Sequence, residues 1–142
     1  MERVYVREQL DAPIEVVWGL IRDFGDITAW ASAARVVRTE GTGVGMIRHI
    51  DGPAGRFVER CEAHDDAAHA FAYRLLESPL PANNFVANVR LTAVAPECCI
   101  IEWGAEFEAP AAPDLHDRIE EVYRDGFIGT VRKTLSKAKD AK

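Results

Sequence analysis

Hydrophobic and polar residues alternate through much of the first 108 residues. A period of two is typical of strands that have one face in a core and the other in water. It predicts one strand over 3–10 and six more in succession after residue 33, joined by turns of Gly, Pro, Asp and Asn. The six are expected near Ala34–Thr39, Gly45–Ile50, Arg56–Ala63, Ala70–Leu76, Phe85–Val94 and Cys98–Glu108. Short connections between successive strands favour antiparallel pairing.

Two segments instead have the spacing of amphipathic helices. The stretch "DAPIEVVWGLIRDFG", 11–25, places Val17, Trp18 and Ile21 on one face, and a longer helix is expected from about Asp114 to Lys137. Strand, helix, six strands and a long helix predict an α+β protein with helices over one face of the sheet. The 142 residues favour a single domain, 1–142, with volume for one core.

One strand carries a carboxylate on its apolar face. In "RFVERCEAHDD", 56–66, the polar face holds Val58, Arg60, Glu62 and His64, and the inward face holds Phe57, Glu59, Cys61 and Ala63. If the preceding loop is 52–55, Arg48 lies opposite Glu59 and also points inward. The next hairpin then places Leu75 across from Glu59, and Tyr73 diagonal to it.

This inward polar group has two interpretations. Arg48 and Glu59 can form a buried ion pair that satisfies only itself. Alternatively, Glu59 anchors a ligand or acts as a general acid or base inside an apolar pocket. A nearby cation stabilises the charged carboxylate and opposes the role of general acid.

Composition and charge limit the kinds of partner that the chain is expected to bind. Hydrophobic residues make up 48% of the chain. The net charge is −6, and the sequence predicts no basic face that could bind nucleic acid. No apolar run suggests a signal peptide or a membrane span, and three cysteines suit a reducing, cytoplasmic protein. The histidines and aspartates of "HDDAAH" are expected to be solvated on a hairpin tip, so we expect no metal and no cofactor.

Five segments in this order, "DAPIEVVWGLIRDFGD", "GTGVGMIRHI", "ERCEAHDD", "SPLPANNF" and "IEWGAEFE", resemble the START-like (SRPBCC) superfamily, in its polyketide cyclase/dehydrase and lipid-transport group. The resemblance implies a helix-grip fold, in which a curved seven-stranded antiparallel sheet wraps the C-terminal helix around an internal cavity. It places Glu59 in the pocket and aligns Arg35 with a basic pocket position of related plant receptors. The expected pocket residues are Arg35, Arg48, Glu59, Phe71, Tyr73, Leu75, Phe85, Ala87, Trp103, Tyr123 and Phe127.

The sequence therefore predicts a protein that binds a small, largely apolar molecule, aromatic, polyketide-like or lipid-like, as a carrier or a sensor. The alternative is a cyclase or dehydratase with Glu59 and Tyr73 as acid/base groups. The resemblance also implies a mobile lid over 77–84. Gly126, on the inward side of the C-terminal helix, either leaves room for a ligand or for a bend, or packs closely on a strand. A homodimer is left open.

Overall fold

All seven predicted strands pair in one antiparallel sheet in the computed structural model, which describes residues 1–140. The strand order is β1-β7-β6-β5-β4-β3-β2, so only β1 is paired out of chain order. The bounds are β1 Glu2–Leu10, β2 Arg35–Glu40, β3 Ile47–Gly52, β4 Gly55–Asp65, β5 Ala70–Glu77, β6 Asn83–Ala95 and β7 Cys98–Glu108. The α+β class predicted from the alternation is confirmed.

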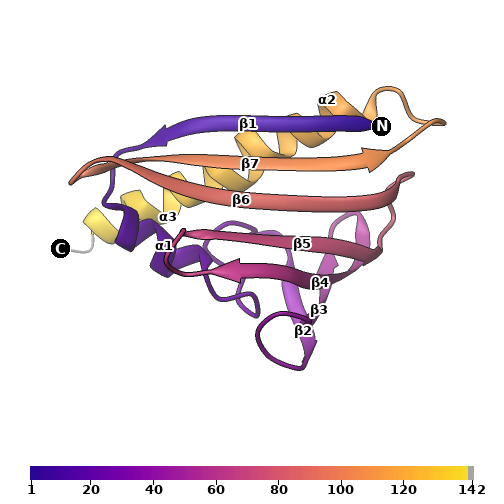
Figure 1. Ribbon diagram of the computed structural model, residues 1–142, viewed down its shortest axis with the longest axis horizontal. Coiled ribbons are helices and arrows are strands. Elements are labelled where there is room, and N and C mark those ends of the chain that lie inside the picture. Colours follow the sequence, from indigo (N-terminus) through magenta and orange to yellow (C-terminus); the bar gives the residue numbers. More distant parts are fainter. Residues whose placement is uncertain (141–142) are drawn as a thin grey trace.

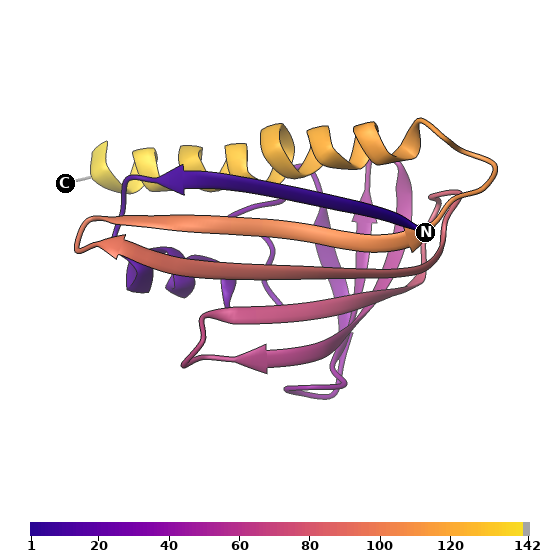
Figure 2. The ribbon, with the colours of Figure 1, turned by 45° about the horizontal axis from the view of Figure 1, so that its top comes forward.

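The sheet is strongly curved. Figure 1 shows β2 and β3 turned across the direction of β5, β6 and β7, and Figure 2 shows the long C-terminal helix lying along the sheet. That helix consists of α2 (Leu115–Glu121), a π-helical segment η1 (Val122–Ile128) and α3 (Gly129–Asp140), while the short α1 (Ile14–Ile21) follows β1. A curved sheet around a long helix is the predicted helix-grip fold, which is confirmed.

The predicted register of the two central hairpins is confirmed. Arg48 pairs with Glu59 across β3 and β4, and Glu59 pairs with Leu75 across β4 and β5. Tyr73 faces Cys61, two residue pairs along from Glu59 and on the same face of the sheet. The carboxylate therefore points into the molecule because the alternation of β4 is held in register by both neighbours.

The predicted alternation of β4 fails in two places. Val58, predicted on the solvent face, is only 8% exposed, and a register shift against β5 falls between it and Glu59. A bulge between Cys61 and Ala63 leaves Glu62 without a partner in β5. One extra residue exchanges the two faces of a strand, so Ala63 is exposed and His64 turns inward to lie 5.5 Å, centroid to centroid, from the ring of Trp18. The expectation that His64 faces solvent was therefore wrong.

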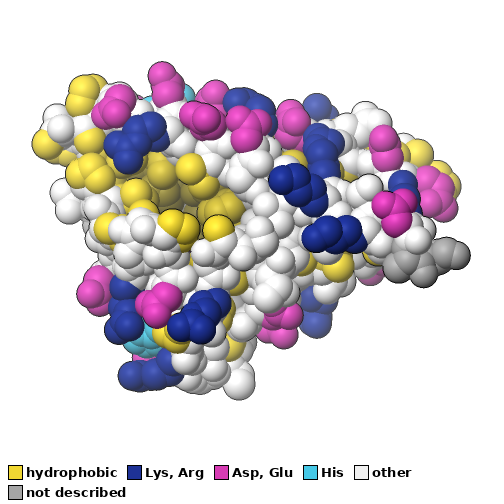
Figure 3. All heavy atoms as spheres, turned by 180° about the vertical axis from the view of Figure 1, so that it is seen from behind, with side chains coloured by type: hydrophobic (Ala, Val, Ile, Leu, Met, Phe, Trp, Pro, Cys, Tyr) yellow, Lys and Arg dark blue, Asp and Glu magenta, His cyan; other side chains and the backbone are white. Residues whose placement is uncertain are grey.

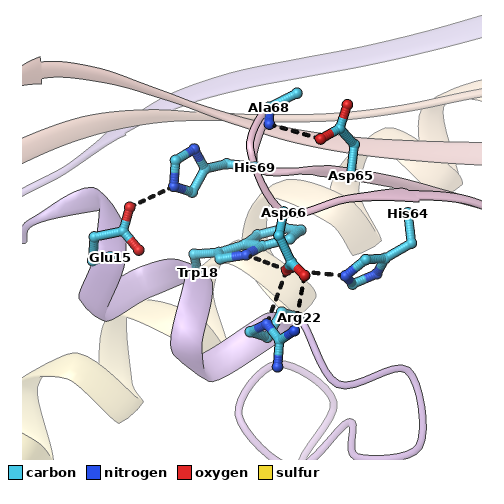
Figure 4. Close-up of polar contacts among 8 residues, drawn as sticks. All are labelled: Glu15, Trp18, Arg22, His64, Asp65, Asp66, Ala68 and His69. Carbon is cyan, nitrogen blue, oxygen red and sulfur yellow. Dashed lines mark hydrogen bonds and ion pairs between the residues drawn. The ribbon is translucent and has the colours of Figure 1, made fainter. Parts of the chain in front are cut away.

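The turn between β4 and β5 is bonded to α1 and its neighbouring residues, as Figure 4 shows, although residues 65–68 remain exposed. Asp66 accepts hydrogen bonds from the indole of Trp18 at 2.9 Å and from two guanidinium nitrogens of Arg22, both at 3.0 Å. The ring of His64 lies 3.1 Å from the same carboxylate, and His69 lies 2.6 Å from Glu15 of α1. The "HDDAAH" segment thus positions α1. Its aspartates are exposed as predicted, whereas the side chains of His64 and His69 are only 22% and 18% exposed, so the prediction was wrong for the histidines.

Acid should weaken this attachment. Hydrogen bonding to Arg22, and then to His64 and Trp18, holds the pKa of Asp66 well below its usual range. A carboxyl group whose pKa is lower in the folded chain stabilises the fold above its unfolded pKa, about 3.9, and this contribution is lost as the pH falls through the folded value. We expect Asp66→Asn to lower the melting temperature at pH 7, and the gap to wild type to close below about pH 4.

Thermal unfolding followed by circular dichroism from pH 7 down to pH 2 measures this gap. Asp125→Asn is the matched control, because Asp125 is exposed and has no ion pair among residues 1–140. A difference between wild type and Asp66→Asn that stays constant to the lowest pH would contradict the assignment.

Candidate functional site

The centre of the site is a buried ion pair between neighbouring strands. Arg48 and Glu59 are 1% and 7% exposed. Arg48 Nε donates a hydrogen bond of 2.8 Å to Glu59 Oε1, and Nη2 lies 2.7 Å from the same oxygen as an ionic contact without hydrogen-bond geometry. The predicted inward pair is confirmed.

Arg48 is enclosed on every side by protein groups. Its Nη1 donates a hydrogen bond of 3.0 Å to the carbonyl oxygen of Phe24. The guanidinium carbon lies 3.8 Å from the ring centroid of Phe24, 4.9 Å from that of Tyr73 and 5.3 Å from that of Trp30. Aromatic faces attract a cation, and here the three rings cover the part of the guanidinium group that Glu59 does not contact. Glu59 and the aromatic rings therefore compensate the buried charge of Arg48, although its Nη2 nitrogen has no hydrogen-bond partner among the described residues.

Beside this pair is a cavity of about 510 Å³ between the sheet and the C-terminal helix. Its wall is contributed by Ile27 and residues 30–34, strands β3 to β6, the turn between β3 and β4, the loop after β5, and the C-terminal helix. Figure 3 shows hydrophobic side chains gathered in a hollow of the surface. Six of the predicted pocket residues line the cavity, namely Glu59, Tyr73, Leu75, Phe85, Tyr123 and Phe127.

The buried part of this wall carries few polar atoms, and they are incompletely paired. Both contacts of Arg48 fall on Glu59 Oε1, so Oε2 has no protein donor among the described residues. Tyr73 accepts a long hydrogen bond, 3.4 Å, from the indole nitrogen of Trp103. Burial raises the pKa of the Tyr73 hydroxyl, and the nearby Glu59 carboxylate raises it further, so the hydroxyl keeps its proton. The cavity thus meets one free acceptor and two O–H groups, because the buried Tyr123 borders it beside Glu59 and Tyr73.

The structure corrects the predicted wall at five positions, because Arg35, Arg48, Phe71, Ala87 and Trp103 do not border the cavity. Arg35 is exposed on the edge strand β2, opposite Asp51. Arg48 lies behind Glu59 and its aromatic cover. The other three are packed inside the core, where Trp103, 0% exposed, contacts other aromatic rings and no free space.

Sequence reasoning missed much of the wall outside the strands. Trp30, buried in the irregular segment between α1 and β2, borders the cavity and contacts both Trp103 and Phe127, with ring centroids 5.0 and 4.8 Å away. Leu80, in the loop predicted to be a lid, also lines it. These segments have no periodicity that would have indicated a buried face. Motion of the lid stays a prediction.

Gly126 lies at the cavity in the π-helical segment of the C-terminal helix. A Cβ atom built at this residue would meet only Val122 Cγ1, at 3.8 Å. Close packing on a strand, one of the two explanations considered for this glycine, is therefore wrong, and the glycine leaves free volume. Single π-helical turns within α-helices occur often at functional sites, where they change the direction of side chains. Here the turn includes Tyr123 and Phe127, which both border the cavity.

A curved sheet that holds a long helix over an internal cavity defines a helix-grip protein of the START-like superfamily. The chain belongs to the family described as polyketide cyclase / dehydrase and lipid transport, whose model matches residues 1–141.

Solved structures with the same fold include an uncharacterised protein from Bacillus thuringiensis, with a TM-score of 0.81 at 21% identity over 93% of this chain and 97% of the other. The aromatase/cyclase ZhuI of Streptomyces sp. R1128 gives a TM-score of 0.71 at 19% identity, covering 97% and 93%. Norcoclaurine synthase from Thalictrum flavum, solved with a transition-state analogue, gives 0.75 at 13% identity, covering 97% and 96%. At these identities the likeness establishes the fold alone.

A search of the curated proteins finds no match. Over residues 1–140, no helix combines the length and the apolar character needed to cross a bilayer.

Proposed function

We propose that this protein binds a small, largely apolar molecule inside the cavity, as a carrier or a sensor. The observation that carries the proposal is a cavity of about 510 Å³ whose buried wall is aromatic and aliphatic, with polar atoms from Glu59, Tyr73 and Tyr123. Cavities of roughly 300–1,000 Å³ with an apolar lining and few polar groups are typical of small-molecule sites. The family supports the same class of ligand.

The free oxygen of Glu59 favours a second candidate, an enzyme of the cyclase or dehydratase type. The carboxylate would accept a proton from a carbon next to a carbonyl group, and Tyr73 would donate a hydrogen bond to the resulting enolate oxygen. Arg48 contacts only Oε1 of Glu59, so Oε2 is the oxygen that would accept the proton. Conversion of a bound ligand, followed by mass spectrometry, separates the enzyme from the carrier.

The cavity can be tested with the neutral fluorescent probe N-phenyl-1-naphthylamine. We expect one molecule to bind per chain, with enhanced emission. Gly126→Leu should weaken this binding by about tenfold or more, because the new side chain occupies free volume that the probe needs. A tenfold loss of affinity corresponds to about 1.4 kcal/mol of binding free energy. Fluorescence titration measures both affinities.

Gly19→Leu is the matched control, since a Cβ atom at this helical glycine would meet no atom within 4 Å, but Gly19 lies on α1 away from the cavity wall. Its affinity for the probe should equal that of the wild type. Unchanged binding in Gly126→Leu, or equal losses in both variants, would show that the probe does not occupy the cavity.

A further inference from the structure

The polar atoms deep in the cavity form a small recognition site with a definite chemistry. Glu59 Oε2 is a strong acceptor without a protein donor in the described chain. Tyr73 already accepts from Trp103, so its own proton remains available to a guest. Glu59 and Tyr73 extend from adjacent strands on the same face, in diagonal positions two residue pairs apart. The hydroxyl of Tyr123, which also borders the cavity, is a second donor there. A ligand group at this point meets an acceptor and a donor together.

The charges of Arg48 and Glu59 balance each other, although a ligand in the cavity cannot reach Arg48. Arg48 and Glu59 together are neutral, and the guanidinium is covered by Glu59, Phe24, Tyr73 and Trp30. A ligand carboxylate placed at this point would therefore meet the outer oxygen of Glu59 and could not reach Arg48. Arg118 also lines the cavity, but its side chain is 58% exposed and lies 3.7 Å from Asp114. A ligand ammonium group would lose its water to face an acceptor whose charge is already compensated, and burying an ion without a full counter-charge is costly.

We propose that the cavity selects ligands by a neutral hydroxyl group, phenolic or alcoholic, which donates its proton to Glu59 Oε2 and accepts from the hydroxyl of Tyr73. The inference rests on the proposed binding function and specifies the ligand class. A hydroxyl group is both a donor and an acceptor, so it satisfies both protein groups, whereas an ether satisfies only Tyr73. Glu59 and Tyr73 are then the specificity-determining residues, and Arg48 positions the carboxylate.

Four naphthalene derivatives of similar size test this selection at pH 7. They are 2-naphthol, 2-methoxynaphthalene, 2-naphthoate and protonated 2-naphthylmethylamine, each measured by displacement of N-phenyl-1-naphthylamine and by calorimetry. We expect 2-naphthol to bind about tenfold tighter than the methyl ether, because the ether leaves Glu59 Oε2 unpaired. Both ions should bind about a hundredfold more weakly than 2-naphthol.

Variants of Glu59 and Tyr73 then test which residue produces the selectivity. Glu59→Gln keeps an amide oxygen for Arg48 but turns a donor toward the cavity, so the preference for 2-naphthol over its ether should fall about tenfold, with ether binding little changed. Tyr73→Phe should weaken both ligands, since both accept from its hydroxyl. Glu62→Gln is the control, because Glu62 lies on the same strand but pairs with Arg60 and Arg74 outside the cavity.

The outcomes separate the two proposals. If neither N-phenyl-1-naphthylamine nor any naphthalene derivative binds, the proposed function fails and the inference falls with it. If the probe binds but the ether or either ion binds as tightly as 2-naphthol, the cavity holds ligands and the hydroxyl selection alone is overturned. The four affinities measured on the wild-type protein test the hydroxyl selection even if Glu59→Gln does not fold.

Discussion

Replacing Arg48 by methionine is expected to lower the free energy of unfolding by about 3–5 kcal/mol. The substitution keeps a long apolar side chain among Phe24, Trp30 and Tyr73 but leaves the carboxylate of Glu59 without its cation. A buried charge that has lost its partner costs several kcal/mol, which is much more than the pair itself contributes. Urea unfolding followed by tryptophan fluorescence measures the loss.

The double variant Arg48→Met/Glu59→Leu distinguishes charge from packing. With both ions removed and similar volume retained, stability should return to within about 1 kcal/mol of wild type. Arg56→Met is the control, because the ion pair of Arg56 with Asp51, at 3.3 Å, is exposed and should contribute less than about 1 kcal/mol. A double variant as unstable as the single one would show that Arg48 acts through packing alone.

Trp103→Ala is expected to cost about 3–5 kcal/mol of stability, the range for removing a buried aromatic side chain. Trp103 is fully buried, and its ring lies 5.0 Å from that of Trp30, 5.1 Å from that of Phe127 and 5.8 Å from that of Tyr123, centroid to centroid. These three line the cavity, so their common support is lost. Affinity for N-phenyl-1-naphthylamine should fall as well, although Trp103 does not border the cavity.

Trp103→Phe retains an aromatic ring and should lose less stability, while removing the hydrogen bond to Tyr73. Leu76→Ala is the control on the neighbouring surface, because Leu76 is exposed and its truncation should change stability by less than about 0.5 kcal/mol. Denaturant unfolding and probe titration on the same samples compare the three variants. A Trp103→Ala protein within 1 kcal/mol of wild type would contradict the assigned role.

The pairing of Arg48 with Glu59 could be predicted because it depends on local rules. The alternation of β4 sets the face of Glu59, and the short turn 52–55 sets its register against β3. The same rules gave seven antiparallel strands and a long C-terminal helix, since each strand and helix has its own period and its own turn residues. These features require no knowledge of distant contacts.

The extent of the cavity was decided only by the tertiary structure. Periodicity shows that Trp103 and Tyr73 both face inward, but not that Trp103 is covered by Trp30 while Tyr73 borders free space. Trp30 lies in an irregular segment, and the bulge after Cys61 turns His64 inward without a sequence signal that we recognised. Free volume is what remains after segments distant in the chain have packed together, so it has no period in the sequence.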